Sequence, residues 1–248
     1  MDQETFDYWV TQGYNRIPVS KTILADVETP LSAYMKLAAG PYSFLFESVQ
    51  GGEKWGRYSI IGLPARQRIR VQGKQITLER DGVAPTVFES EDPLAEVEAQ
   101  HATFRSAPIE GLPVFHGGLV GYFGYDVVRY VETKLEQHDQ IDALNTPDIL
   151  LLVAEEVLVF DNLAGTLTMV VTANAEEPDA RLAALARLKA LEHQLPQPGP
   201  VLEPISLEGV GLEAIEAAAR YHTSPTQFMG WVETIRKSIL DGDVMQVV

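Results

Sequence analysis

The stretch Ser43-Phe44-Leu45-Phe46-Glu47-Ser48-Val49 is apolar through its first half and ends in a carboxylate and a hydroxyl. Its aromatic and aliphatic residues predict a β-strand, and Gly51-Gly52 after it predicts a turn into a second strand over residues 57–62. Two more short strands follow at residues 67–71 and 75–79, separated by a glycine turn. Short strands joined by glycine turns are typical of an antiparallel meander.

The sequence also predicts three strands later in the chain and five helices along its length. Residues 149–153 and 157–160 predict strands, and a hairpin turn at residues 161–165 leads into another over 166–172. Apolar residues at helical spacing predict helices as well. These helices cover residues 4–13, 30–40, 92–104, 178–195 and 224–242. The second begins with Thr29 as its cap and carries Leu31, Tyr34, Met35 and Ala38 on its apolar face. The third carries Leu94, Val97 and His101 on one side.

Two segments near the C-terminal end bear on how the chain is divided. Four prolines within residues 195–204 predict a linker. The last five residues, 244–248, are apolar and β-prone, and such a run exposes an adhesive edge unless it pairs. We expect either that the sequence continues in a longer protein or that this run is a terminal strand docked in a sheet.

Composition excludes several classes of function. The 248 residues include no cysteine, so disulfides, thiolate metal sites and a cysteine nucleophile are absent from this chain. A formal net charge of −16 makes nucleic acid and anionic membranes poor partners. The acidic start does not resemble a signal peptide, and no apolar stretch reaches the roughly 18 residues of a membrane span. We expect a cytoplasmic protein that binds neither nucleic acid nor membranes.

Most generic catalytic motifs are missing from the sequence. It contains no P-loop and no Gly-x-Ser-x-Gly elbow, and its five histidines are scattered without the spacing of a metal site. Glycines at 118, 121 and 124 superficially resemble a dinucleotide loop, but the spacing and the following sequence do not fit one. Glycines spaced this way among apolar residues instead predict a strand packed closely against another backbone.

Three polar residues near the opening stretch are candidate ligand contacts. Glu47 and Ser48 could receive an ammonium group and hydrogen-bond a ligand, and Arg57 could pair with Glu47 or with a ligand carboxylate. The alternative for all three is an ordinary polar strand end that faces solvent. The residues by themselves favour that alternative.

Several segments, taken in order, resemble the anthranilate synthase component I family of chorismate-using enzymes. They are DVETPLSAYMKL at 26–37, SFLFES at 43–48, GRYSIIG at 56–62, GGLVGYFGYD at 117–126, Pro147-Asp148, and ILDGDVMQVV at 239–248. The resemblance covers nearly the whole chain. It implies an α+β fold, in which antiparallel β-sheets pack in a sandwich-like core with surrounding helices, truncated before the chorismate-binding region.

The resemblance also implies an activity for the whole protein. Members of the family convert chorismate and ammonia to anthranilate and pyruvate with Mg²⁺, the first step of tryptophan biosynthesis. Ammonia comes from glutamine through a glutamine amidotransferase, component II, and L-tryptophan inhibits the reaction. The family's catalytic residues and metal ligands correspond to positions beyond Val248, so no catalytic residue and no metal ligand is expected here.

What transfers to this chain is the tryptophan site. The family's Leu-Leu-Glu-Ser element places effector contacts at Glu47 and Ser48, with Phe46 in place of the second leucine, and Arg57 lies where a basic residue lines the site. We expect an N-terminal regulatory domain over residues 1–195, a linker over 196–204 and the start of the chorismate-binding domain over 205–248. This portion should be inactive alone. The alternatives are aminodeoxychorismate synthase component I and a stand-alone amino-acid-binding module.

Overall fold

The computed structural model of the chain describes residues 1–248 except 51–53, 136–143, 202–208 and 210. The chain divides into two compact units, Met1–Pro200 and Val201–Val248, and each is described by itself. The division lies within the proline-rich range 196–204. The functional labels attached to the parts of the chain stay predictions.

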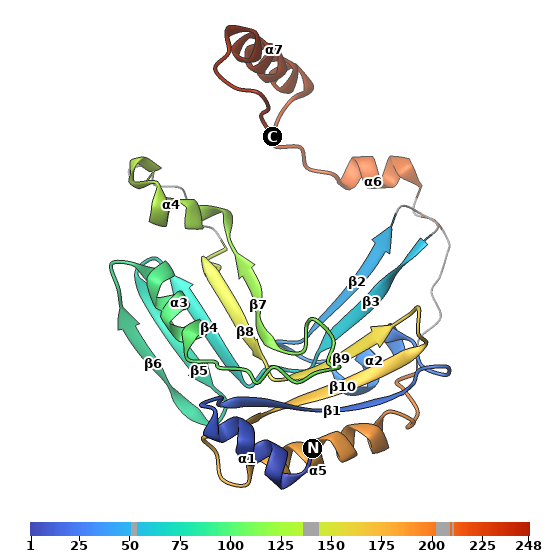
Figure 1. The fold of residues 1–248 in the computed structure, drawn as a ribbon. Helices are drawn as coiled ribbons and strands as arrows, with labels where there is room; N and C mark the ends of the chain where they lie inside the picture. The colour runs from blue at the N-terminus through green and yellow to red at the C-terminus, as the bar shows by residue number, and fades with distance from the viewer. Residues whose placement is uncertain (51–53, 136–143, 202–208, 210) are drawn as a thin grey trace. The chain divides into compact units, whose positions relative to one another are not determined.

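The first unit is built on two five-stranded antiparallel sheets (Figure 1). In strand order, the first sheet contains β1 (Arg16–Leu24), β10 (Thr166–Asn174), β9 (Glu156–Asp161), β3 (Lys54–Gly62) and β2 (Phe44–Gln50). The second sheet contains β6 (Val83–Glu89), β5 (Gln75–Arg80), β4 (Gln67–Gln72), β8 (Ile149–Ala154) and β7 (Gly118–Phe123). The expected α+β class with antiparallel sheets is confirmed.

The predicted uninterrupted meander is wrong. β2 pairs with β3, and β4 pairs with β5, but β3 takes β9 as its other neighbour and β4 takes β8. Between β3 and β4 the chain crosses from the first sheet to the second, and it crosses back at Glu155, between β8 and β9. The central residues of β9 are all buried, so that strand occupies the interior of a sheet and pairs along both edges.

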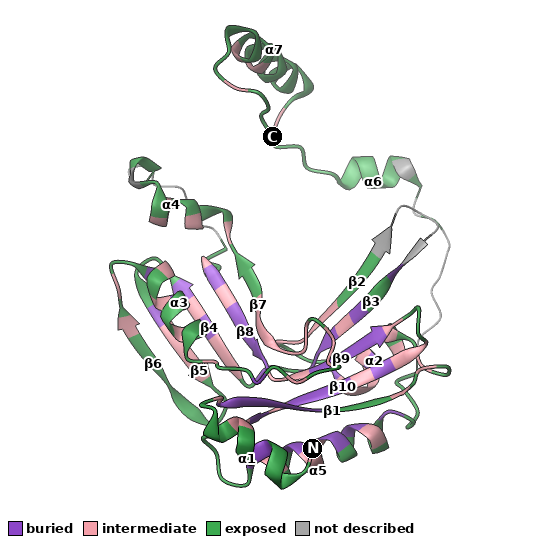
Figure 2. Ribbon diagram, viewed as in Figure 1, coloured by how far each residue is buried: buried purple, intermediate pink, exposed green. Residues whose placement is uncertain are grey.

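Helices cover the outer face of the first sheet. They are α1 (Gln3–Thr11), α2 (Pro30–Leu37) and α5 (Ala180–Gln194), and their apolar sides pack on its strands in the largest core cluster (Figure 2). α5 buries Ala184, Leu188 and Leu191, which recur at helical spacing and lie on one face. α2 begins with the expected cap, because the Thr29 and Ser32 side chains exchange hydrogen bonds with each other's backbone.

Two details of the helix faces differ from the sequence prediction. Leu31 was expected on the apolar face of α2 but is 55% exposed, whereas Ala33 is fully buried. The small residue faces the core because α2 lies close to the strands. α3 (Pro93–Ala102) packs Val97 and Leu94 against the second sheet as predicted, but His101 is exposed at its last turn.

The glycine-rich segment forms β7, as the sequence predicts. A Cβ atom at Gly121 would lie 1.9 Å from the carbonyl oxygen of Leu150 on β8, so only glycine allows this approach. Short helical turns follow at η1 (Tyr125–Val127), α4 (Val128–Val131) and η2 (Thr133–Leu135). The predicted turn at Gly51-Gly52 lies outside the described residues.

The second unit contains α6 (Leu212–Ala218) and α7 (Pro225–Asp241). α7 matches the helix predicted over residues 224–242, with Ser224 as its cap and Gly242 ending it with a φ of +83°. Residues 244–248 form no strand, so the alternative of a docked terminal strand is wrong for this structure. α6 and β6 were not predicted. Across the described parts of the chain, no helix has the length and apolar character needed to cross a membrane.

Candidate functional site

The three predicted ligand contacts lie on the β2–β3 pair, at a break in its register. Glu47 faces Ser59 across the two strands, and Val49 faces Trp55. Ser48 alone therefore stands opposite three residues of β3, residues 56–58. A bulge of this kind bends the strand and redirects its side chains. β2 is also an edge strand of its sheet, so its outer side is open to a ligand.

Ser48 lies directly over Gly56. A Cβ atom at Gly56 would come 2.1 Å from the Cβ atom of Ser48 and 2.3 Å from its Oγ atom. Any larger residue at position 56 would therefore displace the serine. The Gly56 carbonyl also accepts a hydrogen bond from Nδ2 of Asn162 at 3.0 Å, which fixes this part of the bulge.

Glu47 and Ser48 are both exposed, but they belong to opposite faces of β2. Glu47 is in register with Ser59 and shares the helix-covered face with Leu45 and Ile61. Ser48, as the next residue, points to the other face, because successive side chains alternate along a strand. A single ligand that contacts both must extend around the edge of β2.

Arg57 already has a carboxylate partner, which is not Glu47. Its Nε atom lies 3.1 Å and its Nη2 atom 2.8 Å from Oδ2 of Asp161, and its guanidinium lies 4.9 Å from the ring centroid of Tyr58. The suggested Glu47–Arg57 pair is therefore replaced by an Arg57–Asp161 pair. In the β3–β9 pair Tyr58 is in register with Asp161, so the preceding residue, Arg57, lies beside that carboxylate.

Asp161 also organises the turn after β9. Its Oδ1 atom accepts hydrogen bonds from the backbone N–H groups of Leu163 and Ala164, each at 3.1 Å. The Arg57 hydrogen bond is the main cause that holds the pKa of Asp161 below its ordinary value, and the same bond raises the pKa of Arg57. A ligand carboxylate that binds Arg57 must share it with Asp161.

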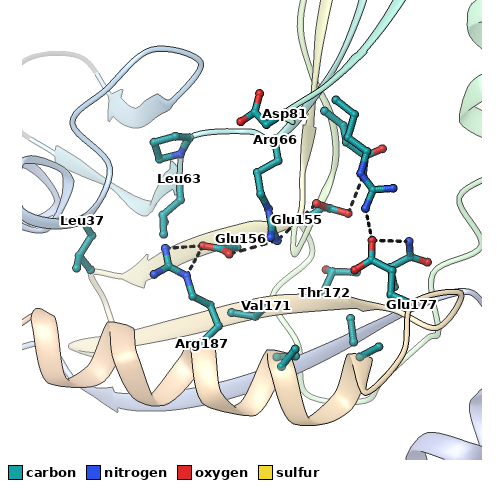
Figure 3. A pocket seen from close by; sticks show the side chains of 18 of the residues that line it. Leu37, Leu63, Arg66, Asp81, Glu155, Glu156, Val171, Thr172, Glu177 and Arg187 are labelled. Atoms are coloured by element: carbon teal, nitrogen blue, oxygen red, sulfur yellow. Dashed lines mark hydrogen bonds and ion pairs between the residues drawn. The ribbon is translucent and has the colours of Figure 1, made fainter. Parts of the chain in front are cut away.

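A feature that the sequence did not predict is a cavity of about 650 Å³ where the chain crosses between the sheets (Figure 3). Its walls come from the link between β3 and β4, the β8–β9 junction, β10 and α5. Figure 3 shows Arg66, Glu155, Glu156 and Arg187 converging on it. The available signal was the adjacent pair of glutamates at 155 and 156 between two apolar strands.

The arginines of this cavity are paired with carboxylates. Arg187 donates to Oε2 of Glu156 from Nε at 2.8 Å, and its Nη2 atom lies 2.8 Å from the same oxygen. Arg66 lies 3.6 Å from Glu156 and 3.9 Å from Glu155. Burial raises the pKa of Glu155 in spite of the nearby arginines. Because the arginines and carboxylates are paired, we interpret this cavity as the polar junction of the two sheets.

The described residues contain no cluster of metal ligands. Among the described residues, no group of three or more histidine, aspartate or glutamate side chains is arranged to hold a metal ion. Mg²⁺ is usually held by only one or two carboxylates together with water and substrate oxygens, so its binding by the whole protein stays a prediction. No catalytic step through Mg²⁺ follows from these residues.

Comparison with known proteins adds to this geometry. A family model described as chorismate binding enzyme matches residues 43–248. The chain belongs to the chorismate binding enzyme family. The matched range begins at Ser43 and includes both the β2–β3 bulge and the glycine-rich strand β7.

Individual relatives in the chorismate binding enzyme family match the chain from end to end. It is 48% identical over 248 residues to anthranilate synthase component 1 of Pseudomonas aeruginosa and 41% identical over 253 aligned residues to that of Neisseria meningitidis. The chain spans about half the length of these curated relatives, and it corresponds to their first half. The resemblance seen in the sequence motifs is confirmed.

A solved structure supports the fold of this chorismate binding family member. The crystal structure of anthranilate synthase component I from Streptococcus pneumoniae matches 89% of this chain and 46% of that chain, with a TM-score of 0.56 and 28% sequence identity. The two-sheet architecture is therefore shared with a solved relative. The roles of Glu47, Ser48 and Arg57 are not tested by these comparisons and stay predictions.

Proposed function

We propose that this chain is the N-terminal portion of the large subunit of an anthranilate synthase. The whole protein would convert chorismate and ammonia to anthranilate and pyruvate, the first step of tryptophan biosynthesis. The observation that carries the proposal is the match of all 248 residues to anthranilate synthase component 1 of Pseudomonas aeruginosa at 48% identity. Ammonia would come from glutamine through an amidotransferase partner, and Mg²⁺ would be bound by the other half of the protein in the cytoplasm.

The role proposed for this portion is to bind L-tryptophan as a feedback inhibitor. Glu47 supplies a carboxylate for the ammonium group, Ser48 supplies a hydroxyl, and Arg57 supplies a cation for the carboxylate. The open edge of β2 and the exposure of Glu47 and Ser48 support access by a ligand. Inhibition requires only that tryptophan bind the inactive arrangement of the enzyme more tightly than the active one.

The test is Ser48→Ala in the full-length enzyme. Alanine keeps the Cβ atom that lies over Gly56 and removes only the hydroxyl, so the bulge should persist. Loss of one hydrogen bond worth about 1 kcal/mol should weaken tryptophan inhibition about fivefold. Chorismate turnover should stay unchanged. Ser20→Ala is the matched control, because Ser20 is an exposed serine on β1, the other edge strand of the same sheet.

The outcomes separate this proposal from its alternatives. Equal tryptophan inhibition in Ser48→Ala and the unaltered enzyme would refute the effector site. Pyruvate release by the full-length enzyme identifies anthranilate synthase, whereas an aminodeoxychorismate synthase retains the pyruvyl group. The 248-residue chain alone should form no anthranilate from chorismate and ammonia. The rest of the tryptophan pocket is expected from the other half of the protein, so the 248-residue chain alone should bind tryptophan weakly. Strong binding by that chain alone, measured by calorimetry, would favour an amino-acid-binding module.

A further inference from the structure

A second, smaller cavity shares Glu155 in its lining with the one in Figure 3. Its volume is about 160 Å³, and it is lined by the start of β1, the end of α3 and the segment after it, the residues that lead into β7, the end of β8 and Thr172 of β10. It therefore adjoins the place where the chain crosses between the sheets. None of the predicted effector contacts lines it. A cavity of about 150 Å³ is large enough for a benzene-sized ligand.

Arg16 lines this cavity and is held rigidly there. The residue is only 8% exposed. Its Nη1 atom donates to the Asn15 carbonyl at 3.1 Å and to Oδ1 of Asn174 at 2.6 Å. Its guanidinium lies 5.0 Å from the ring centroid of Phe104, and its backbone N–H donates to the Arg105 carbonyl at 3.0 Å. The guanidinium is thus fixed before any ligand arrives.

One edge of that guanidinium has no partner among the described residues. Its Nε atom is buried and has no hydrogen-bond partner among the described residues, and none is found for Nη2 in that part of the chain. Buried polar groups in folded proteins are almost always hydrogen-bonded, above all when they are charged. The N–H bonds of Nε and Nη2 point the same way and form the planar fork that arginine uses to bind a carboxylate through two hydrogen bonds.

The acidic residues near Arg16 do not fill this fork. Glu155 lines the same cavity, but the hydrogen bond found for its side chain comes from Gln67 at 3.4 Å, and Arg66 lies 3.9 Å away. Glu176 approaches only Nη1 of Arg16, at 3.9 Å. Burial raises the pKa of Glu155.

We propose that this cavity binds a small monocarboxylate with a short apolar body, anchored by the Nε–Nη2 edge of Arg16. Phe104, Val153 and Ala154 provide an apolar wall for the body of the ligand. A single negative charge matches the single free edge. Phosphate, with a charge of about −1.5 to −2, is disfavoured because Glu155 lines the same cavity. The inference is independent of the effector site proposed at Glu47 and Ser48.

The test follows the Nε–H resonance of Arg16 by NMR in the ¹⁵N-labelled 248-residue chain. That resonance is assigned by through-bond experiments on a chain that is also ¹³C-labelled, and it should be absent from Arg16→Lys, which keeps the charge but removes the fork. Sodium benzoate should shift it saturably, with a Kd on the order of 1 mM. Nuclear Overhauser contacts should connect the benzoate ring with the ring of Phe104. Sodium chloride at equal ionic strength controls for screening.

Two variants and a second anion serve as controls for benzoate binding. Benzoate should bind at least tenfold more weakly to Arg16→Lys. It should bind unchanged to Arg187→Lys, whose arginine pairs with Glu156 in the larger cavity. If benzoate does not shift the Arg16 resonance of the unaltered chain, the proposal is overturned. That outcome does not depend on whether Arg16→Lys folds. Equal binding by Arg16→Lys, or tighter binding of inorganic phosphate than of benzoate, would overturn it as well.

Discussion

Replacing Gly121 with alanine should destabilise the two-sheet unit through a backbone clash. Gly121 lies on β7 opposite Leu151 of β8, and an added Cβ atom would stand 1.9 Å from the Leu150 carbonyl oxygen. Real Cβ atoms essentially never approach closer than 3.0 Å, so β7 must move away by at least 3.0 − 1.9 = 1.1 Å at this point. The obstacle is backbone of the neighbouring strand, so no side-chain rotation relieves it.

The size of the effect follows from that displacement. Backbone hydrogen bonds of about 2.9 Å would lengthen to about 4 Å, beyond the useful range, and each is worth about 0.5–1.5 kcal/mol. Loss of two such bonds and the accompanying packing strain of about 1–3 kcal/mol predict a total cost of about 2–6 kcal/mol. The cost stays in this range because β7 is an edge strand and can separate from β8 alone.

Urea denaturation of the 248-residue chain, followed by circular dichroism, measures this cost as a change in the free energy of unfolding. Gly40→Ala is the matched control, because the nearest atom to an added Cβ there is a Pro64 side-chain carbon at 3.5 Å, an ordinary contact. It should change stability by no more than about 0.5 kcal/mol. If Gly121→Ala proved as stable as Gly40→Ala, the close approach of β7 and β8 would be wrong.

Two further predictions concern pH. Burial raises the pKa of Glu155 in the folded chain above its ordinary 4.5. The contribution of this group to the free energy of unfolding is therefore fully present below pH 4.5 and is lost as the pH rises through the folded-state pKa. Glu155→Gln should therefore gain stability relative to the unaltered chain as the pH rises from 4.5 towards 8 in urea titrations, and a constant difference would contradict this. The pKa of Asp161 is held below 3.8, mainly by the Arg57 hydrogen bond, so its contribution is present above pH 3.8 and is lost as the pH falls through the folded-state pKa. Asp161→Asn should be the less stable form near pH 7 and should approach the unaltered chain below pH 3.8 in thermal melts, whereas a deficit that persists at the lowest pH would point to the turn rather than to the charge.

The local elements of the fold were predictable because their signals are local. Thr29 caps α2, Ser224 caps α7, and Gly242 ends α7 in the left-handed conformation, each as the sequence indicates. The turn between β9 and β10 was likewise predicted from its residues. These features depend on a few consecutive residues and their backbone hydrogen bonds, so neighbours distant in the sequence do not alter them.

The partners of the strands were not predictable in the same way. β3 and β9 are about a hundred residues apart, and nothing local in either strand specifies that they pair. For the same reason the sequence did not show that Arg57 would bind Asp161 rather than Glu47. The cavity beside Arg16 is a further case, since its walls come from five separate segments. Such features arise from tertiary packing, which outweighs local pattern.

The structure gives a physical reason why the two motifs at 43–48 and 56–62 occur together. At one end of the β2–β3 pair, the ring of Phe44 covers Gly62, where an added Cβ atom would lie 1.9 Å from the ring. At the other end, Ser48 covers Gly56. Each glycine leaves space for a side chain of the opposite strand, so the motifs are two halves of one packing arrangement. Gly56 on β3 therefore sets the position of the Ser48 hydroxyl. A ligand that hydrogen-bonds to this hydroxyl would also depend on that glycine.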